Sequence, residues 1–151
     1  MKNIPKILVT PGEPAGIGYD ILLDLTEKNF EANIISIASI EILKERADLL
    51  KKKINFIKVD INDSNFPKIA ENDILVHDLK NTCNVQIGKP NIQHVPLILE
   101  SLDLAIAACL GKIANALVTG PVQKSIIMKY GANFSGHTEY IASKTGGEPI
   151  M

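Results

Sequence analysis

The protein has 151 residues, 46% of them hydrophobic, and is therefore long enough to bury a core of its own. Its 16 basic and 17 acidic residues give a formal net charge of -1, which excludes the strongly basic surface that nucleic acids and anionic membranes attract. The apolar run near the amino terminus is too short for a signal sequence or a membrane-spanning helix. We therefore expect a cytoplasmic protein with a small-molecule partner, and neither a nucleic-acid nor a membrane partner.

Short apolar runs alternate with segments of helical periodicity along the chain. In chain order, the pattern predicts a strand at residues 6–10, a helix at 18–29, a strand at 32–38, a helix at 40–53, strands at 55–59 and 73–79, a helix at 92–110, a strand at 115–120, and helices at 124–130 and 139–146. Ser39 is the expected N-cap of the second helix, and Ile21, Leu22 and Leu25 share one face of the first. Such alternation predicts an α/β fold with a largely parallel sheet flanked by helices, which binds ligands at the carboxyl ends of its strands.

Two histidines and the cysteines have structural explanations. His94 lies beside Pro96 at the start of a predicted helix, where we expect a surface or capping residue rather than a ligand. His77 ends a predicted strand and is expected to have a satisfied hydrogen bond. Neither cysteine has metal-ligand spacing, and Cys109, within an apolar run, is expected to be a buried free thiol in a reducing compartment.

The first stretch that could carry chemistry is TPGEPAGIGYD, residues 10–20, which follows the first strand and opens a helix. Gly12, Gly16 and Gly18 permit backbone geometries or close approaches that a Cβ atom would block. The loop could cradle an anion, but its spacing matches neither the phosphate-binding loop nor the dinucleotide fingerprint. A rigid connection between strand and helix is the alternative.

Two further stretches lie at helix starts, where free backbone N–H groups favour anions. In VTGPVQKS, residues 118–125, Lys124 is either a cation that pairs with phosphate or an ordinary solvated lysine. In FSGHTE, residues 134–139, Thr138 can cap the following helix, which places His137 and Thr138 where a phosphate or carboxylate would be stabilised. His137 could instead form a local hydrogen bond that fixes the turn.

Taken together, TPGEPAGIG, VTGPVQK and FSGHTE resemble, in order and spacing, the 4-hydroxythreonine-4-phosphate dehydrogenases of vitamin B6 biosynthesis, the PdxA family. The resemblance implies a fold similar to that of the isocitrate and isopropylmalate dehydrogenases, and a homodimer. It implies oxidation of 4-phosphohydroxythreonine by NAD or NADP, with decarboxylation to 3-amino-2-oxopropyl phosphate. A divalent metal, zinc, magnesium or cobalt, is also implied.

The resemblance also assigns residues. His137 and Thr138 match the family's histidine and threonine that contact the substrate. An active-site loop is suggested for Gly12, Glu13, Gly16, Gly18 and Lys124. The family's metal ligands, and most of its cofactor-binding residues, match positions beyond residue 151, so no residue here is expected to bind metal, and no catalytic residue is assigned. Tyr19, where the family often has proline, and Gln123, where it often has histidine, depart from the family pattern.

Residues 148–151 have the character of the start of another strand. We therefore expect residues 1–151 to be the amino-terminal portion of a longer α/β dehydrogenase, without activity on its own. Two alternatives remain open at this point. The parent protein could be a related dehydrogenase of a sugar-acid phosphate, or the chain could be a non-catalytic module for phosphate binding or dimerisation.

Overall fold

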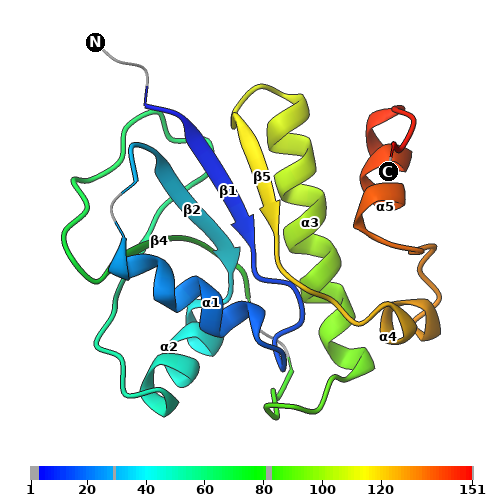
Figure 1. Ribbon diagram of the computed structural model, residues 1–151, viewed down its shortest axis with the longest axis horizontal. Helices are drawn as coiled ribbons and strands as arrows, with labels where there is room; N and C mark the ends of the chain where they lie inside the picture. The colour runs from blue at the N-terminus through cyan, green and yellow to red at the C-terminus, as the bar shows by residue number, and fades with distance from the viewer. Residues whose placement is uncertain (1–3, 29, 81–82, 151) are drawn as a thin grey trace.

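The computed structural model describes residues 4–28, 30–80 and 83–150. Its elements in chain order are β1 (Lys6–Thr10), α1 (Gly18–Asp24), the 3-10 turn η1 (Leu25–Glu27), β2 (Asn33–Ala38), α2 (Ile40–Leu49), β3 (Asn55–Lys58), β4 (Asp73–Asp78), the 3-10 turn η2 (Ile92–His94), α3 (Val95–Leu110), β5 (Ala116–Thr119), α4 (Lys124–Lys129) and α5 (His137–Thr145) (Figure 1). The predicted strands and the predicted alternation with helices are confirmed.

The strands form one parallel sheet in the order β3-β4-β2-β1-β5. From β1 the chain moves through α1 to β2, and later returns from β4 through α3 to β5, on the other side of β1. Right-handed crossovers in opposite directions place α3 on the opposite face of the sheet from α1 and α2. The direction of winding therefore reverses between β1 and β5. In open α/β sheets, ligands bind beyond the carboxyl ends of the two strands at such a reversal.

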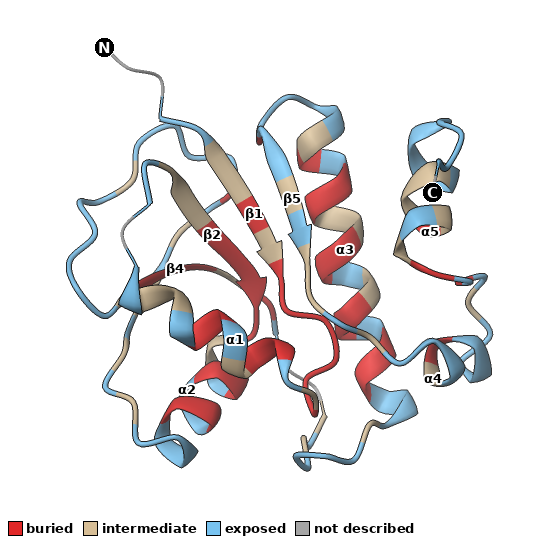
Figure 2. Ribbon diagram, in the orientation of Figure 1, coloured by how far each residue is buried: buried red, intermediate tan, exposed pale blue. Residues whose placement is uncertain are grey.

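Two hydrophobic clusters hold these layers together (Figure 2). The larger one contains the central strands and the buried faces of α1 and α2, with Leu8, Ile35 and Leu75 fully or almost fully buried. The smaller one joins α3 to α4 and α5, and its members are Val95, Ile98, Leu102, Ile106, Ile127, Phe134 and Tyr140. The second cluster fixes α4 and α5 against α3.

One face of β1 and β5 carries an apolar groove of about 340 Å³. Ile21 lies in this groove together with Leu22, Leu25 and Val118, and its side chain is 52% exposed. The expected common face of Ile21, Leu22 and Leu25 thus exists, but it packs into the core only through Leu22 and Leu25. Tyr19 and Leu23 supply the rest of the packing from this helix.

Some predicted boundaries were wrong, and so was the last predicted strand. The first helix ends at Asp24, with a 3-10 turn after it, instead of at residue 29. The second helix ends at Leu49 instead of residue 53, because the chain turns at Lys51, whose φ is 54°. The last helix begins two residues earlier than predicted, at His137. Residues 148–150 form no strand, and Met151 lies outside the described residues. The Ser39 N-cap is confirmed, since its side chain accepts a hydrogen bond from the N–H of Ile42.

The segment Ile92–Leu110, made of η2 and α3, is long and apolar enough to cross a membrane by length and composition alone. Half of it is buried inside the protein, where α3 packs against β1, β2 and β5. Cys109 is only partly buried on this helix, less than expected, and burial raises the pKa of its thiol. The apolar character of the segment Ile92–Leu110 is therefore explained by its packing in the core.

Candidate active site at the sheet reversal

The loops that follow β1 and β5 are held against each other at the carboxyl edge of the sheet. The N–H of Glu13 donates to the carbonyl oxygen of Pro121 at 3.0 Å, and the N–H of Gly120 donates to that of Thr10 at 2.6 Å. Both pairs join residues more than a hundred positions apart in the sequence. The two glycine-containing stretches singled out from the sequence therefore form one structural unit.

Glycine is required at some positions of this unit and not at others. Gly12 has a φ of +81°, in the left-handed region, and a Cβ atom there would collide with the carbonyl of Pro121. A Cβ atom at Gly18 would collide with the carbonyl oxygen of Pro11. At Gly16 the nearest atom to such a Cβ is the carbonyl oxygen of Glu13, 3.3 Å away, and φ lies outside the left-handed region. The close approach expected at Gly16 is therefore much weaker than at Gly12 and Gly18.

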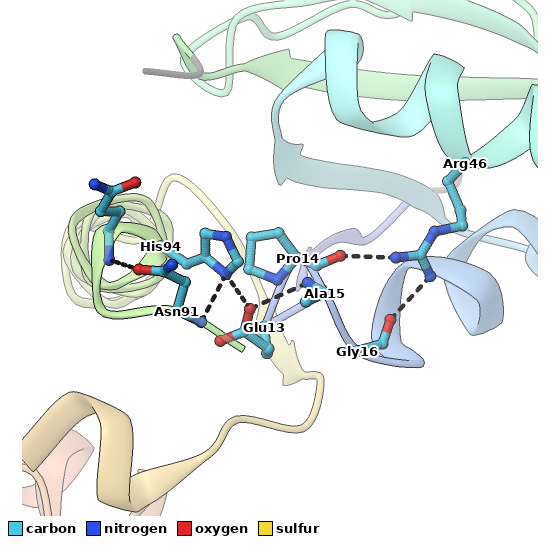
Figure 3. Close-up of polar contacts among 8 residues, drawn as sticks. Glu13, Pro14, Ala15, Gly16, Arg46, Asn91 and His94 are labelled. Carbon is cyan, nitrogen blue, oxygen red and sulfur yellow. Dashed lines mark hydrogen bonds and ion pairs between the residues drawn. The ribbon is translucent and has the colours of Figure 1, made fainter. Parts of the chain in front are cut away.

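Arg46 of α2 fixes the outer half of the β1–α1 loop (Figure 3). Its guanidinium donates to the carbonyl oxygens of Pro14 at 2.8 Å and Gly16 at 3.0 Å. It also forms an ion pair of 2.6 Å with Asp20 of α1. The arginine side chain is only 3% exposed, so these are its main interactions. The side chain holds the loop in one conformation.

Glu13, a predicted loop residue, turns its carboxylate inward (Figure 3). Its Oε1 lies 2.5 Å from Nδ1 of His94 and accepts the N–H of Ala15 at 3.1 Å. His94 is fully buried, so the expectation of a surface residue was wrong. The alternative expectation, a capping residue, is confirmed by its capping box with Asn91 at the start of η2.

The start of α5 is the second part of the site. Gly136 is its N-cap, with φ 169° and ψ 172°, and no side chain caps the helix. Thr138 is the second residue of the helix and is exposed, so the prediction that it caps the helix was wrong. The first N–H groups of a helix have no partner within it, and its dipole makes this end positive. The start of α5 therefore presents donors suited to an anion.

Lys124, the first residue of α4, approaches the start of α5. Its Nζ would lie 3.2 Å from a Cβ atom built on Gly136, and Oε2 of Glu139 would lie 2.6 Å from the same position. The exposed ammonium of Lys124 and the half-buried imidazole of His137 thus flank the first turn of α5. The structure brings together Lys124, His137 and Thr138, as the sequence motifs suggested, and adds the Glu139 carboxylate beside them.

His137 is packed so that its uncharged form is favoured. Its ring meets the ring of Phe134 edge-on, with centroids 5.6 Å apart. Burial, and next the positive charge of Lys124, lower the pKa of His137 below its ordinary value. At neutral pH the ring is therefore a neutral hydrogen-bonding group beside a cation.

We expect this pKa shift to appear in the pH dependence of stability. The unfolded chain takes up the proton near the ordinary pKa of 6.5, before the folded chain does, so acid favours unfolding. Wild type should lose stability relative to His137→Gln as the pH falls from about 7.5 to about 5, which urea unfolding measures. A difference between the two proteins that is the same at every pH would contradict this expectation.

The β1–α1 loop and the start of α5 meet only indirectly. Among the described residues, no hydrogen bond joins residues 11–18 to residues 136–139. The connection runs through Pro121, which accepts from Glu13 and lies three positions before Lys124. No group of three or more histidine, cysteine, aspartate or glutamate side chains that could hold a metal ion occurs in the described part of the chain.

Comparison with known proteins now relates this geometry to a family. The family model described as "Pyridoxal phosphate biosynthetic protein PdxA" matches residues 30–151. The chain belongs to the PdxA family. The 4-hydroxythreonine-4-phosphate dehydrogenases of Pseudoalteromonas translucida and Methylococcus capsulatus are 38% and 37% identical to it, each over 97% of the chain. The chain spans 44% of the length of each of these relatives.

Solved structures of the PdxA family have the same fold. The chain aligns with 4-hydroxythreonine-4-phosphate dehydrogenases from Burkholderia phymatum (TM-score 0.85, 18% identity) and Klebsiella pneumoniae (TM-score 0.83, 22% identity). The two alignments cover 96% and 94% of this chain, and 44% and 45% of the solved chains. A terephthalate 1,2-cis-dihydrodioldehydrogenase from Burkholderia xenovorans aligns over 91% of this chain and 40% of its own, with a TM-score of 0.69 and 16% identity. These alignments confirm the predicted α/β dehydrogenase fold.

The two departures from the PdxA family pattern have different structural outcomes. Tyr19 is the second residue of α1 and is 1% exposed, so it is a core residue as well as part of a helix start. Burial, followed by the charge of Glu13, raises the pKa of Tyr19 far above its ordinary value. Gln123 is exposed before α4, and its amide contacts Ser125 Oγ at 3.4 Å.

Arg46 and His94 are the residues of this site that sequence reasoning missed. Arg46 lies on the buried stripe of α2 with Ile42, Leu43 and Ala47, so helical spacing was a usable signal for it. His94 had no such signal, because its partner Glu13 lies 81 positions away.

Proposed function

We propose that this chain is the amino-terminal portion of a 4-hydroxythreonine-4-phosphate dehydrogenase of pyridoxal phosphate biosynthesis, and that it supplies part of the substrate site. Membership of the PdxA family supports the reaction. The observation that carries the assignment of the site is the uncapped start of α5, where Lys124 and His137 flank the first turn. The substrate is then a phosphorylated hydroxy acid, and 4-phosphohydroxythreonine fits the family name.

The start of α5 would bind an anionic end of this substrate. Backbone N–H groups of the first turn and the Thr138 hydroxyl can donate hydrogen bonds to phosphate or carboxylate oxygens. Lys124 adds a positive charge, which strengthens binding of an anion more than a neutral donor would. His137, held mainly neutral, can donate or accept one hydrogen bond without adding charge.

The cofactor and the metal belong to the same proposal. A nicotinamide cofactor, NAD or NADP, would accept the hydride when the substrate alcohol is oxidised to a ketone. The described residues do not fit a divalent metal such as zinc, magnesium or cobalt, because no cluster of ligands is present among them. We propose that this portion acts within a longer cytoplasmic homodimeric enzyme and has no turnover alone.

Thr138→Val tests the assignment of the substrate site. In a chain completed with the carboxy-terminal part of the Pseudoalteromonas translucida relative, the change should raise KM for 4-phosphohydroxythreonine about tenfold or more, because it removes a hydrogen bond to a charged group. The rate is measured from the absorbance of the reduced nicotinamide that the reaction produces.

The matched control is Thr145→Val at the other end of α5, where the hydroxyl bonds only to carbonyl oxygens of the same helix. It should leave KM unchanged. Equal kinetics of the two variants would remove Thr138 from the substrate site. A panel that includes sugar-acid phosphates tests the related dehydrogenase activity, and phosphate binding without turnover by the completed chain would favour the non-catalytic module.

A further inference from the structure

The Glu13–His94 pair has no role in the proposed substrate contacts, yet it is the most deeply buried polar pair of the site. Glu13 is 4% exposed and His94 is fully buried. Their contact of 2.5 Å is shorter than an ordinary charge-assisted hydrogen bond. In one tautomer, Nδ1 of His94 carries a proton and donates it to Oε1 of Glu13. In the other tautomer, the same nitrogen accepts the N–H of Asn91 at 3.3 Å, which is the contact of the capping box.

Stability alone is a poor explanation for this pair. Within the described part of the protein, Oε2 of Glu13 and Nε2 of His94 are buried and have no hydrogen-bond partner. Burying polar groups costs desolvation energy, which a contact between them offsets only when the remaining polar atoms are satisfied. Two apolar side chains of similar size would be expected to stabilise this place as well or better.

The pair does, however, connect the two halves of the site. Through its backbone N–H, Glu13 holds Pro121, and the chain from Pro121 leads directly to Lys124 at the start of α4. His94 immediately precedes α3, the helix against which α5 packs. That packing includes a hydrogen bond of 2.7 Å from Tyr140 Oη to Asp103 of α3.

We propose that Glu13 and His94 are positioning residues that set the place of Lys124 relative to the first turn of α5. Their hydrogen bond ties the loop that holds α4 to the helix that holds α5. This role rests on the proposed function of α5 as an anion site, but the position of the α4 start can be measured without any ligand.

The experiment is NMR of the 151-residue protein and of Glu13→Gln, which keeps the side-chain shape and removes the charge. In wild type, the imidazole of His94 should carry its proton on Nδ1, with a low-field signal that disappears in Glu13→Gln. Backbone amide shifts should change at residues 120 and 122–124, and binding of inorganic phosphate should weaken by about tenfold. Glu31→Gln, a substitution of an exposed carboxylate, is the matched control and should change none of these.

Changes confined to residues 12–16 and 91–94, with phosphate affinity unaltered, would overturn the proposal, as would a wild-type His94 without a proton on Nδ1. If wild type binds no inorganic phosphate, the proposed anion site fails, and the amide shifts at residues 120 and 122–124 still decide the positioning role. His94→Gln keeps a hydrogen-bond donor for the carboxylate, so this variant should retain the wild-type amide shifts at those residues. This second variant also decides the question if Glu13→Gln does not fold, since amide shifts at residues 120 and 122–124 unlike those of wild type would then count against the proposal.

Discussion

Arg46→Met is expected to lower the free energy of unfolding by about 3 kcal/mol, or roughly 10 °C in Tm. Methionine fills most of the same volume but donates no hydrogen bond. The carbonyl oxygens of Pro14 and Gly16 would lose their donor, and Asp20 would lose its ion-pair partner. Asp20 is 30% exposed, so water compensates part of its loss. Most of the loss of stability should therefore come from the two backbone carbonyl oxygens that lose their hydrogen-bond donor.

Lys44→Met is the matched control for this prediction, because Lys44 lies on the exposed side of the same helix. It should change the free energy of unfolding by less than about 0.5 kcal/mol. Urea unfolding monitored by circular dichroism measures both variants. If Arg46→Met were as stable as Lys44→Met, the arginine would not be the element that fixes the β1–α1 loop.

Gly12→Ala should be as damaging, at about 3 kcal/mol, for a different reason. The added methyl group enters both a left-handed backbone conformation and the space of the Pro121 carbonyl. The clash is with backbone, so it can be relieved only by moving the β5–α4 loop away from the β1–α1 loop. Such a movement would displace Lys124, so the completed enzyme should also lose activity per folded molecule.

Gly88→Ala separates the two causes in Gly12→Ala. Gly88 has a similar φ of +76°, and nothing lies within 4 Å of a Cβ atom built on it. This control should cost only the backbone strain, about 1 kcal/mol. Gly16→Ala should be milder than Gly12→Ala for the same steric reason. Equal losses for Gly12→Ala and Gly88→Ala would mean that the contact with Pro121 has no energetic weight.

The segments that form the proposed site were predictable from the sequence, because they depend on local patterns. Strands at residues 6–10 and 116–119 are short apolar runs that end in glycine-containing turns, and parallel strands bring such turns to one edge. His137 and Thr138 follow a turn and open a helix, which is again a local signal. The neighbouring positions of β1 and β5 then bring their two loops together.

The internal connections of the site were not predictable in the same way. The Glu13–His94 contact joins residues 81 positions apart, and neither residue type indicates its partner. The N-cap of α5 is Gly136, whereas the motif FSGHTE is equally compatible with a helix that starts after Thr138. Ile21 matched the helical pattern of a buried residue, yet it faces the open groove over β1 and β5. Periodicity indicates which residues share a face, but not whether that face is covered.

Titration of the 151-residue protein with 4-phosphohydroxythreonine, followed by amide NMR, tests the central claim most directly. The account predicts saturable shifts concentrated at residues 136–139 and at Lys124. In Lys124→Met, the affinity measured from these shifts should be about tenfold weaker. Lys129→Met, at the exposed far end of α4, should bind as wild type does. Saturable shifts elsewhere in the protein, or none at residues 136–139 at any ligand concentration, would contradict the assignment of the start of α5 as the substrate site.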